Sequence, residues 1–216
     1  MTNVTPDHVL AAYASGAFPM AESRDAEALF WVAPEQRGIL PLERFHLPRR
    51  LARTLKRTPY QITVDRAFGR IIRACASEEA GRQTTWINQE IVELYSELHR
   101  RGFAHSIECW DKGVLVGGLY GVAIGAAFFG ESMFHFEDDA SKLALVYLVA
   151  RLIAGQYQLL DMQWLTDHLE RFGGIEIPRP EYLKLLDIAL RYEGDFAGLP
   201  YDTPSSGILQ LITQTS

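Results

Sequence analysis

Cysteine and long apolar runs are scarce in this chain of 216 residues. Its two cysteines, Cys75 and Cys109, lie in apolar segments without metal-site spacing, so we expect buried free thiols. No apolar run approaches the ~20 residues that span a bilayer. A secretion signal has a basic segment followed by an apolar one, and the first residues lack this pattern. These absences favour a cytoplasmic protein with no membrane partner.

Metal-ligand patterns and internal repeats are also missing. The six histidines have no ligand spacing, so we expect no metal site. What the chain does contain is 48% hydrophobic and 22% charged residues, the composition of a globular protein with a sizeable core.

Charge is unevenly distributed along the chain, whose formal net charge is −6. From Arg37 to Arg57 there are seven basic residues and one acidic residue, whereas from Gly102 onward there are seven basic and fifteen acidic residues. A basic patch on an acidic protein suits phosphates on one side and a cationic partner on the other. The alternative is an ordinary solvated helix face.

Hydrophobic periodicity predicts a mixed order of helices and strands. Helices are expected near 6–15, 48–58, 66–75, 88–101, 139–154, 164–172 and 180–192. Strands are expected at 29–32, 38–41, 61–64, 105–110, 114–120, 122–129 and 159–162. We interpret 16–20 as an apolar turn and Asp65 as a helix cap. Glu131 is expected at a strand end.

This order predicts an α+β fold with a mixed sheet, in which a helical crossover leads to a parallel strand. It resembles the N-acetyltransferase (GNAT) type of acyltransferase domain, preceded by a small α/β N-terminal domain. We expect the small domain at 1–60, the catalytic domain at 61–194 and a loosely attached extension at 195–216. In that fold a glycine-rich, basic loop commonly binds the pyrophosphate of coenzyme A. Here the position holds Glu137, Asp138 and Asp139, which repel phosphate and argue against coenzyme A as the donor.

An ordered series of short motifs then resembles one family, the leucyl/phenylalanyl-tRNA–protein transferases. The series covers roughly 5–186 and includes Phe129-Gly130-Glu131-Ser132-Met133-Phe134, Ala140-Ser141-Lys142, Asp161-Met162-Gln163 and His168-Leu169. Gly16-Ala17-Phe18-Pro19, Thr85-Trp86-Ile87 and the stretch from His105 to Trp110 belong to it as well.

The resemblance implies an enzyme that moves Leu or Phe, and less readily Met, from aminoacyl-tRNA to a protein. The acceptor is implied to carry an N-terminal Arg or Lys, and the product to be a bacterial degradation signal, an N-degron. No metal or organic cofactor is implied. We expect a monomer.

Three polar residues are the candidate catalytic groups. Asp161 and Gln163 are two apart on a strand and should share a face. The resemblance implies that the carboxylate polarises the amide, which takes a proton from the amine. A carboxamide is a weak base, so in a second interpretation Asp161 holds Gln163, whose carbonyl oxygen orients the amine. Glu131 is implied to contact the aminoacyl amino group; the alternatives are an acceptor side chain or a surface role.

An apolar pocket and nucleotide-binding surfaces complete the expected site. Pocket candidates, each of which is otherwise a core residue, are Leu119, Phe129, Met133, Leu148, Leu152 and Leu160. Trp31 and Trp86 offer stacking surfaces for adenine, and Met20 stands where many members have Trp. The tRNA acceptor stem is expected on the basic face made by Arg49, Arg50, Arg53, Lys56 and Arg57.

Two other functions stay open at this point. One is a coenzyme A-dependent N-acetyltransferase, which the acidic helix start disfavours. The other is a non-catalytic RNA-binding protein that keeps the fold.

Overall fold

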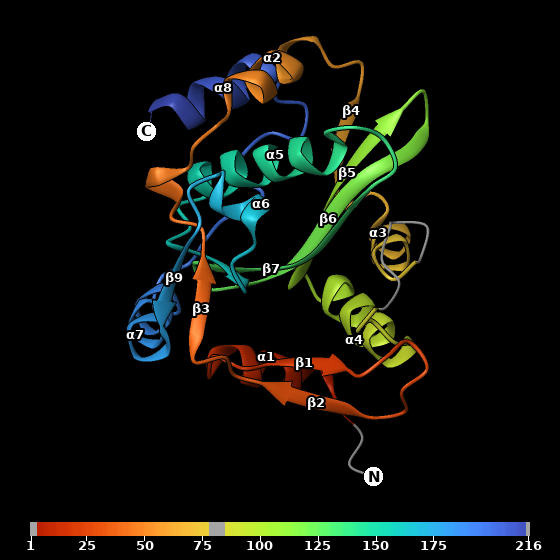
Figure 1. Cartoon of the computed structure of the whole chain (residues 1–216), viewed down its shortest axis with the longest axis vertical. Coiled ribbons are helices and arrows are strands. Elements are labelled where there is room, and N and C mark those ends of the chain that lie inside the picture. Colours follow the sequence, from red (N-terminus) through yellow and green to blue (C-terminus); the bar gives the residue numbers. More distant parts are fainter. Residues whose placement is uncertain (1–3, 78–84, 215–216) are drawn as a thin grey trace.

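A computed structural model describes residues 4–77 and 85–214 of the chain (Figure 1). The helices are α1 (Pro6–Ala14), the 3-10 helix η1 (Leu42–Arg44), α2 (Arg49–Arg57), α3 (Phe68–Cys75), α4 (Gln89–Arg100), α5 (Ala140–Ala154), α6 (Asp167–Glu170), α7 (Arg179–Ala189) and α8 (Ser205–Gln214). The strands are β1 (Phe18–Ala21), β2 (Leu29–Val32), β3 (Gln36–Ile39), β4 (Gln61–Val64), β5 (Ala104–Asp111), β6 (Val114–Ile124), β7 (Ala127–His135), β8 (Leu159–Gln163) and β9 (Ile175–Pro178).

A seven-stranded mixed sheet forms the centre of the molecule, with strand order β4-β5-β6-β7-β8-β3-β9. All neighbours pair antiparallel except β7 and β8, which are parallel and connected through α5. The predicted α+β class, mixed sheet and helical crossover are therefore confirmed. The boundaries at 60 and 194 remain a prediction; β3, which lies before the first of them, is a strand of this sheet.

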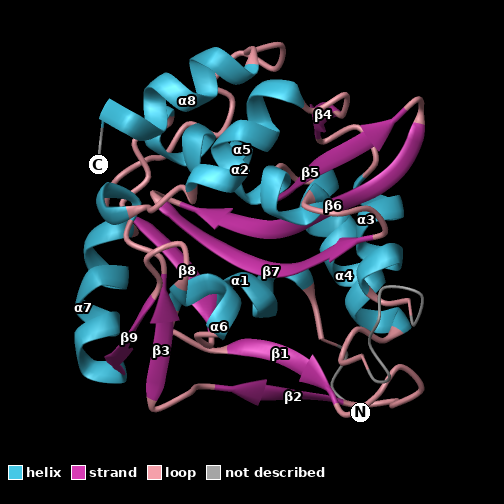
Figure 2. Cartoon of the chain, turned by 45° about the horizontal axis from the view of Figure 1, so that its top comes forward, coloured by secondary structure: helices cyan, strands magenta, loops and turns pink. Residues whose placement is uncertain are grey.

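Helices cover both faces of the sheet (Figures 1 and 2). On one face α5 packs on β5, β6 and β7 with α2 and α8 outside it, and on the other α3 packs on the same strands with α4 beside it. Two large apolar cores result, one containing Leu119 and Leu148 with most of the buried α5 side chains, and one containing Phe68 and Tyr95. Among the described helices, none is long and apolar enough to cross a membrane.

The N-terminal part forms a small unit of its own below the large sheet in Figure 1. Strands β1 and β2 make a two-stranded antiparallel sheet, and α1 packs on β1. The predicted turn at 16–20 is wrong, because Phe18–Ala21 pairs with Leu29–Val32 as a strand. Thr5 caps α1 by accepting a hydrogen bond from the His8 backbone N–H.

Two predictions about strands and one about a cap are also wrong. A strand at 122–129 does not exist, because β6 continues to Ile124 and a turn at Gly125, with φ +56°, leads into β7. Glu131 consequently lies inside β7 and not at a strand end. Asp65 does not cap α3; its carboxylate accepts hydrogen bonds from the Ser106 backbone and from His105.

The last third of the chain differs most from expectation. The helix predicted at 164–172 shrinks to the four residues of α6, and the unpredicted β9 follows it. The segment after 194 is not loosely attached, because Phe196, Leu199, Ile208 and Ile212 are buried in the core with α5. Sequence reasoning missed α8 because its polar, serine-rich start resembles a loop.

The packing of α8 predicts a stability cost on truncating its buried side chains. Ile208 has no exposed surface, so Ile208→Ala should lower the free energy of unfolding by about 2–5 kcal/mol, through lost apolar burial and a residual cavity. Urea denaturation followed by circular dichroism measures this loss from the midpoint and slope.

Gln210→Ala is the matched control, because Gln210 is exposed on the same helix. It should change stability by no more than about 0.5 kcal/mol. Equal stabilities for the two variants would contradict the docked position of α8.

Candidate active site

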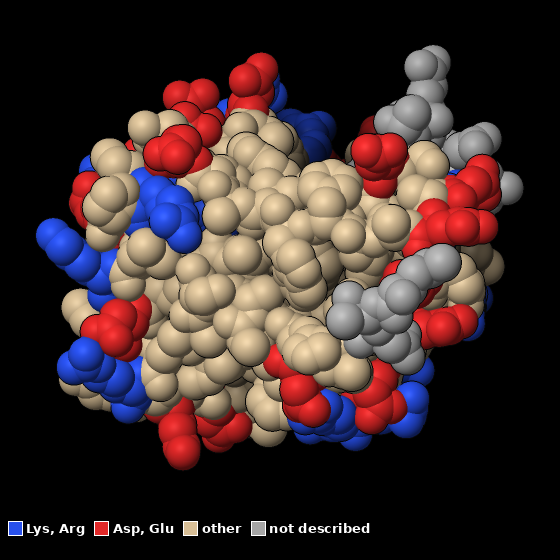
Figure 3. Space-filling model, turned by 90° about the horizontal axis from the view of Figure 1, so that it is seen from below, with Lys and Arg blue, Asp and Glu red and all other residues tan. Residues whose placement is uncertain are grey.

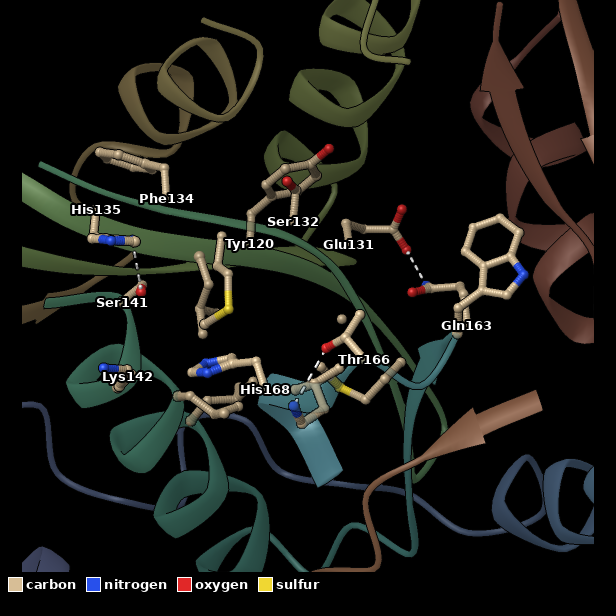
Figure 4. Close-up of a pocket in the computed structure, with 18 of the residues that line it drawn as sticks. Tyr120, Glu131, Ser132, Phe134, His135, Ser141, Lys142, Gln163, Thr166 and His168 are labelled. Atoms are coloured by element: carbon tan, nitrogen blue, oxygen red, sulfur yellow. Dashed lines mark hydrogen bonds between the residues drawn. The ribbon is translucent and has the colours of Figure 1, made fainter. Parts of the chain in front are cut away.

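A cavity of about 460 Å³ opens between β7, the start of α5, the segment after β8 and the N-terminal hairpin (Figure 4). Its wall is mostly apolar, with a few polar side chains. Lining residues are Phe18, Met20, Trp86, Leu119, Tyr120, Gly130, Glu131, Ser132, Met133, Phe134, His135, Ser141, Lys142, Leu145, Leu148, Met162, Gln163, Trp164, Thr166, His168 and Leu169. A concave apolar site with few convergent polar groups is typical of substrate binding.

Glu131 and Gln163 face each other at one end of this cavity (Figure 4). The Gln163 side-chain nitrogen donates to Glu131 Oε1 at 3.1 Å, and the Tyr95 hydroxyl donates to Glu131 Oε2 at 3.2 Å. Tyr95 in turn shares a hydrogen bond with the Tyr13 hydroxyl. The amide orientation that this contact selects leaves the Gln163 carbonyl oxygen available to accept a hydrogen bond.

Asp161 is fully buried and held by an ion pair. Its carboxylate accepts from Arg37 Nε at 2.9 and 3.1 Å and from Nη2 at 2.6 Å. It also accepts from the Tyr182 hydroxyl at 2.7 Å and the Gln163 backbone N–H at 2.9 Å. The guanidinium lies between the rings of Phe18 and Tyr182, 4.8 and 4.6 Å from the centroids. Asp161 thus accepts a hydrogen bond from the backbone N–H of Gln163 and not from its side-chain carboxamide.

The backbone at Gln163 is bent sharply at the end of β8. Gln163 has a left-handed φ of +57°, a conformation that costs free energy in a residue with a side chain. Gly38 of β3 lies opposite, and a Cβ there would be 2.5 Å from backbone atoms of Trp164 and Leu165. The bend therefore requires glycine at 38, and the bond from Asp161 to the Gln163 N–H helps to hold it.

The electrostatic environment of Glu131 is unusual for a carboxyl group. Removal from bulk water raises the pKa of Glu131 to about 7, because this effect and nearby Asp161 outweigh the lowering by Tyr13, Tyr95 and Arg37. A carboxyl group with a pKa near neutrality can both accept and return a proton. Beside it, a carbonyl oxygen can orient an N–H group. This end of the cavity is therefore suited to nucleophilic attack by an amine.

The structure brings some predicted pocket residues together and leaves others in the core. Leu119, Met133 and Leu148 line the cavity with Glu131 and Gln163. Three further candidates are fully buried and are not among the lining residues, namely Phe129, Leu152 and Leu160.

The predicted nucleotide-binding residues divide in the same way. Met20 and Trp86 line the cavity. Trp31 lies on β2, where it pairs with Pro19, and is half-exposed; the cross-strand partner of Met20 is Phe30. The basic side chains of α2 are exposed, and they are Arg49, Arg50, Arg53, Lys56 and Arg57. Arg37, counted with them from sequence, is instead buried beside Asp161.

Several side chains of the candidate site were not identified from the sequence. Tyr13, Tyr95 and Tyr182 lie on helices among apolar residues, where the sequence pattern does not distinguish them from core positions. One signal could have identified Arg37: it directly precedes the predicted apolar strand at 38–41, where burial is expected. A buried arginine in turn requires a carboxylate partner. Groups of acidic, histidine and cysteine side chains able to hold a metal are absent from 4–77 and 85–214.

Family comparisons match almost the whole chain. Residues 39–187 match the model described as leucyl/phenylalanyl-tRNA protein transferase, and residues 2–35 match the model of the N-terminal domain of the same family. The break between the two models falls at the start of β3, the strand that carries Arg37.

Curated relatives with the name leucyl/phenylalanyl-tRNA–protein transferase are similar over their full length. One from Nitrobacter winogradskyi is 56% identical, with 95% of this chain and 92% of that one covered. One from Rhodopseudomonas palustris is 55% identical over 99% and 96%, and one from Caulobacter vibrioides is 54% identical over 98% and 98%. A solved structure of L-PGS from Bacillus licheniformis has a TM-score of 0.46 at 13% identity, covering 74% of this chain and 65% of that one.

Loss of the buried Arg37–Asp161 ion pair should cost much more stability than loss of an ion pair on the surface. Arg37→Met removes one partner and leaves the Asp161 carboxylate without its counter-ion, which should destabilise the protein by about 3–5 kcal/mol. Chemical denaturation at neutral pH measures the loss.

Arg191→Met serves as the control, since Arg191 pairs with Asp187 on the surface, where both side chains are well exposed. Its cost should stay below about 1 kcal/mol. Comparable losses in both variants would show that the Arg37 pair is not a structural centre.

Proposed function

The chain belongs to the leucyl/phenylalanyl-tRNA protein transferase family, and we propose that the Glu131–Gln163 end of its cavity is where the aminoacyl ester meets the acceptor amine. The enzyme transfers an aminoacyl group from tRNA to the N-terminus of a protein. The family thereby decides against the coenzyme A-dependent and non-catalytic alternatives. The observation that carries the proposal is the contact of Gln163 with a carboxyl group whose pKa lies near neutrality.

Transfer is aminolysis of the ester that joins the amino acid to the terminal ribose of tRNA. The acceptor nitrogen attacks the ester carbonyl carbon, a new C–N bond forms, and the ribose C–O bond breaks. The Gln163 carbonyl oxygen accepts a hydrogen bond from the amine and orients its lone pair towards the ester. Asp161 contributes indirectly, by fixing the Gln163 backbone.

The proton released by the amine goes to Glu131 and then to the leaving ribose oxygen. An α-amine has a pKa of about 7.7–8.0, and a carboxylate with a pKa near 7 is matched to it far better than a carboxamide. Glu131 replaces Gln163 as the proton acceptor in this scheme. The tyrosine pair Tyr95–Tyr13 keeps the carboxylate in place.

Substrate preferences follow the family. The apolar wall with Leu119, Met133 and Leu148 suits the side chain of Leu or Phe, and less readily Met. Proteins with an N-terminal Arg or Lys are the acceptors, and the product is an N-degron. The enzyme works as a monomer without a cofactor, on a GNAT-like catalytic domain (61–194) that follows the small domain.

Two surfaces hold the tRNA. Met20 and Trp86 line the cavity and provide apolar contact for the terminal base, with Trp31 outside it. The exposed basic face of α2 contacts the backbone of the acceptor stem, so binding should be sensitive to salt and tolerant of sequence. This helix is at the top of Figure 1, away from the N-terminal hairpin. Figure 3 shows the molecule from below, the end away from α2, where charged side chains lie mainly around the rim.

A direct transfer assay tests the proposal. Purified protein should move labelled Leu or Phe from charged tRNA to a peptide that begins with Arg or Lys, with Met transferred more slowly in competition. Gln163→Ala should lower kcat more than it weakens tRNA binding, because it removes the group that orients the amine.

The same peptide with a blocked α-amine is the control and should receive nothing. Transfer that is equally fast to peptides beginning with Ala or Glu would reject the acceptor assignment. A Gln163→Ala variant with wild-type kcat would reject the orienting role.

The Glu131 carboxyl group predicts a particular pH dependence. Because its raised pKa keeps Glu131 protonated below about pH 7, kcat/KM of the wild type should require two deprotonations, that of Glu131 and that of the acceptor amine, so log kcat/KM should rise with a slope of about two below pH 7. In Glu131→Gln the slope should fall to about one, and the remaining, slower reaction should follow the acceptor amine alone, near pH 8 (about 7.7–8.0). Initial rates with a short Arg peptide measure both profiles.

Glu181→Gln, on the exposed face of α7, should keep the wild-type slope. If Glu131→Gln kept that slope too, Glu131 would not be the proton acceptor.

A further inference from the structure

The end of the cavity opposite Glu131 and Gln163 is lined by polar side chains that the transfer chemistry does not use (Figure 4). His135 ends β7, Ser141 and Lys142 belong to the first turn of α5, and His168 belongs to α6. Ser141 Oγ lies 3.4 Å from His135 Nδ1. Four polar residues from three separate elements therefore converge on one place.

The charge of this end is positive. Lys142, His135 and nearby Arg171 are close enough to His168 to lower its pKa, in addition to the larger effect of its burial. Among the lining residues of the described chain, Glu131 at the far end is the one carboxylate. The amino end of α5 adds partial positive charge. Such an end attracts an anion and repels a cationic acceptor.

Asp139 connects this end to the basic helix α2. Its Oδ1 atom accepts from Lys142 Nζ at 2.6 Å and from Arg50 Nη2 at 2.9 Å, and its side chain is almost fully buried. One carboxylate shared by two cations leaves net positive charge on this bridge. Arg50 of α2 and Lys142 of the cavity wall are therefore connected through one carboxylate.

The other two carboxylates of the acidic run lie elsewhere. Glu137 and Asp138 are exposed and are not among the residues that line the cavity. Both contribute to raising the pKa of Tyr60, after the larger effect of its burial. The expectation that this helix start repels phosphate counted all three carboxylates, whereas the one nearest the cavity, Asp139, is paired with Lys142 and Arg50.

We propose that His135, Ser141, Lys142 and His168 form a subsite for a phosphodiester of the tRNA 3′ end. The proposal rests on the proposed function, in which the donor is the substrate that carries anionic groups. A terminal nucleotide with its ester at Glu131 and Gln163 then passes this end on its way to α2. Lys142 supplies the charge, while Ser141 and the histidines supply hydrogen-bond donors.

Two short donors that differ by one phosphate test this subsite. They are adenosine esterified with leucine on its ribose, and the same ester carrying a 5′-phosphate. In the wild type the phosphate should lower KM about tenfold, the effect of one charge-assisted contact. In Lys142→Gln the ratio of the two KM values should fall to about one, whereas Lys142→Arg should keep much of it.

Arg49→Gln is the matched control on α2, because Arg49 is exposed on the proposed surface for the stem and is not among the residues that line the cavity. It should weaken binding of whole tRNA and leave the KM ratio at its wild-type value. Any general damage to the site raises KM for both donors alike, so it cancels in the ratio of the two KM values.

A ratio near one in the wild type, or a wild-type ratio in Lys142→Gln, would overturn the subsite while leaving the transferase itself intact. If the wild type uses neither short donor, the salt dependence of tRNA binding decides. Lys142→Gln must then reduce the slope of log Kd against log salt by about one. An unchanged slope would also overturn the proposal. Failure of whole aminoacyl-tRNA to react at all would instead reject the proposed function.

Discussion

The ion pair between Arg37 and Asp161 holds together the parts of the chain on which the site depends. It joins β3 to β8, and through Tyr182 it adds α7, while the Arg37 guanidinium also donates to the Gly16 carbonyl at 3.2 Å beside the N-terminal hairpin. A buried charge pair of this kind is costly to desolvate and much more costly to break. The position of the Gln163 backbone follows from it, because Asp161 accepts that N–H as well.

This constraint changes how the chemistry is divided among the three polar residues. A carboxylate already engaged by Arg37, Tyr182 and a backbone N–H has little capacity left to activate a neighbouring amide. Glu131 differs, since its partners are neutral hydrogen-bond donors and its surroundings raise its pKa. Of two carboxyl groups in one site, the paired one serves structure and the unpaired one is suited to move a proton.

Features set by residues close together in the chain could be predicted from sequence, and features set by distant partners could not. The helix at 88–101 and the strand at 61–64 follow from periodicity. The motifs placed Glu131 and Gln163 in one candidate site, and the structure adds the hydrogen bond between their side chains. Arg37 could not be assigned, because its role depends on a partner 124 positions away. Strand β9 and helix α8 were missed because their apolar patterns are short, and both elements are stabilised by distant parts of the chain: β9 pairs with β3, and α8 packs on α5. Sequence alone likewise could not show that Phe30, and not Trp31, lies opposite Met20, because this depends on the register in which β1 pairs with β2.

An acidic protein can bind a polyanion when its charges are sorted in space. The basic side chains of α2 stay exposed, and Arg50 and Lys142 together neutralise Asp139 at the start of α5. Because interactions between exposed charges are screened beyond about 8–10 Å, the net charge of −6 matters less to a phosphate than the groups beside it. The same sorting suits the acceptor proposed above, because the positive charge of an N-terminal Arg or Lys is attracted to the Glu131 end of the cavity and repelled by the Lys142 end. Opposite charges at the two ends of one cavity therefore give donor and acceptor different directions of approach.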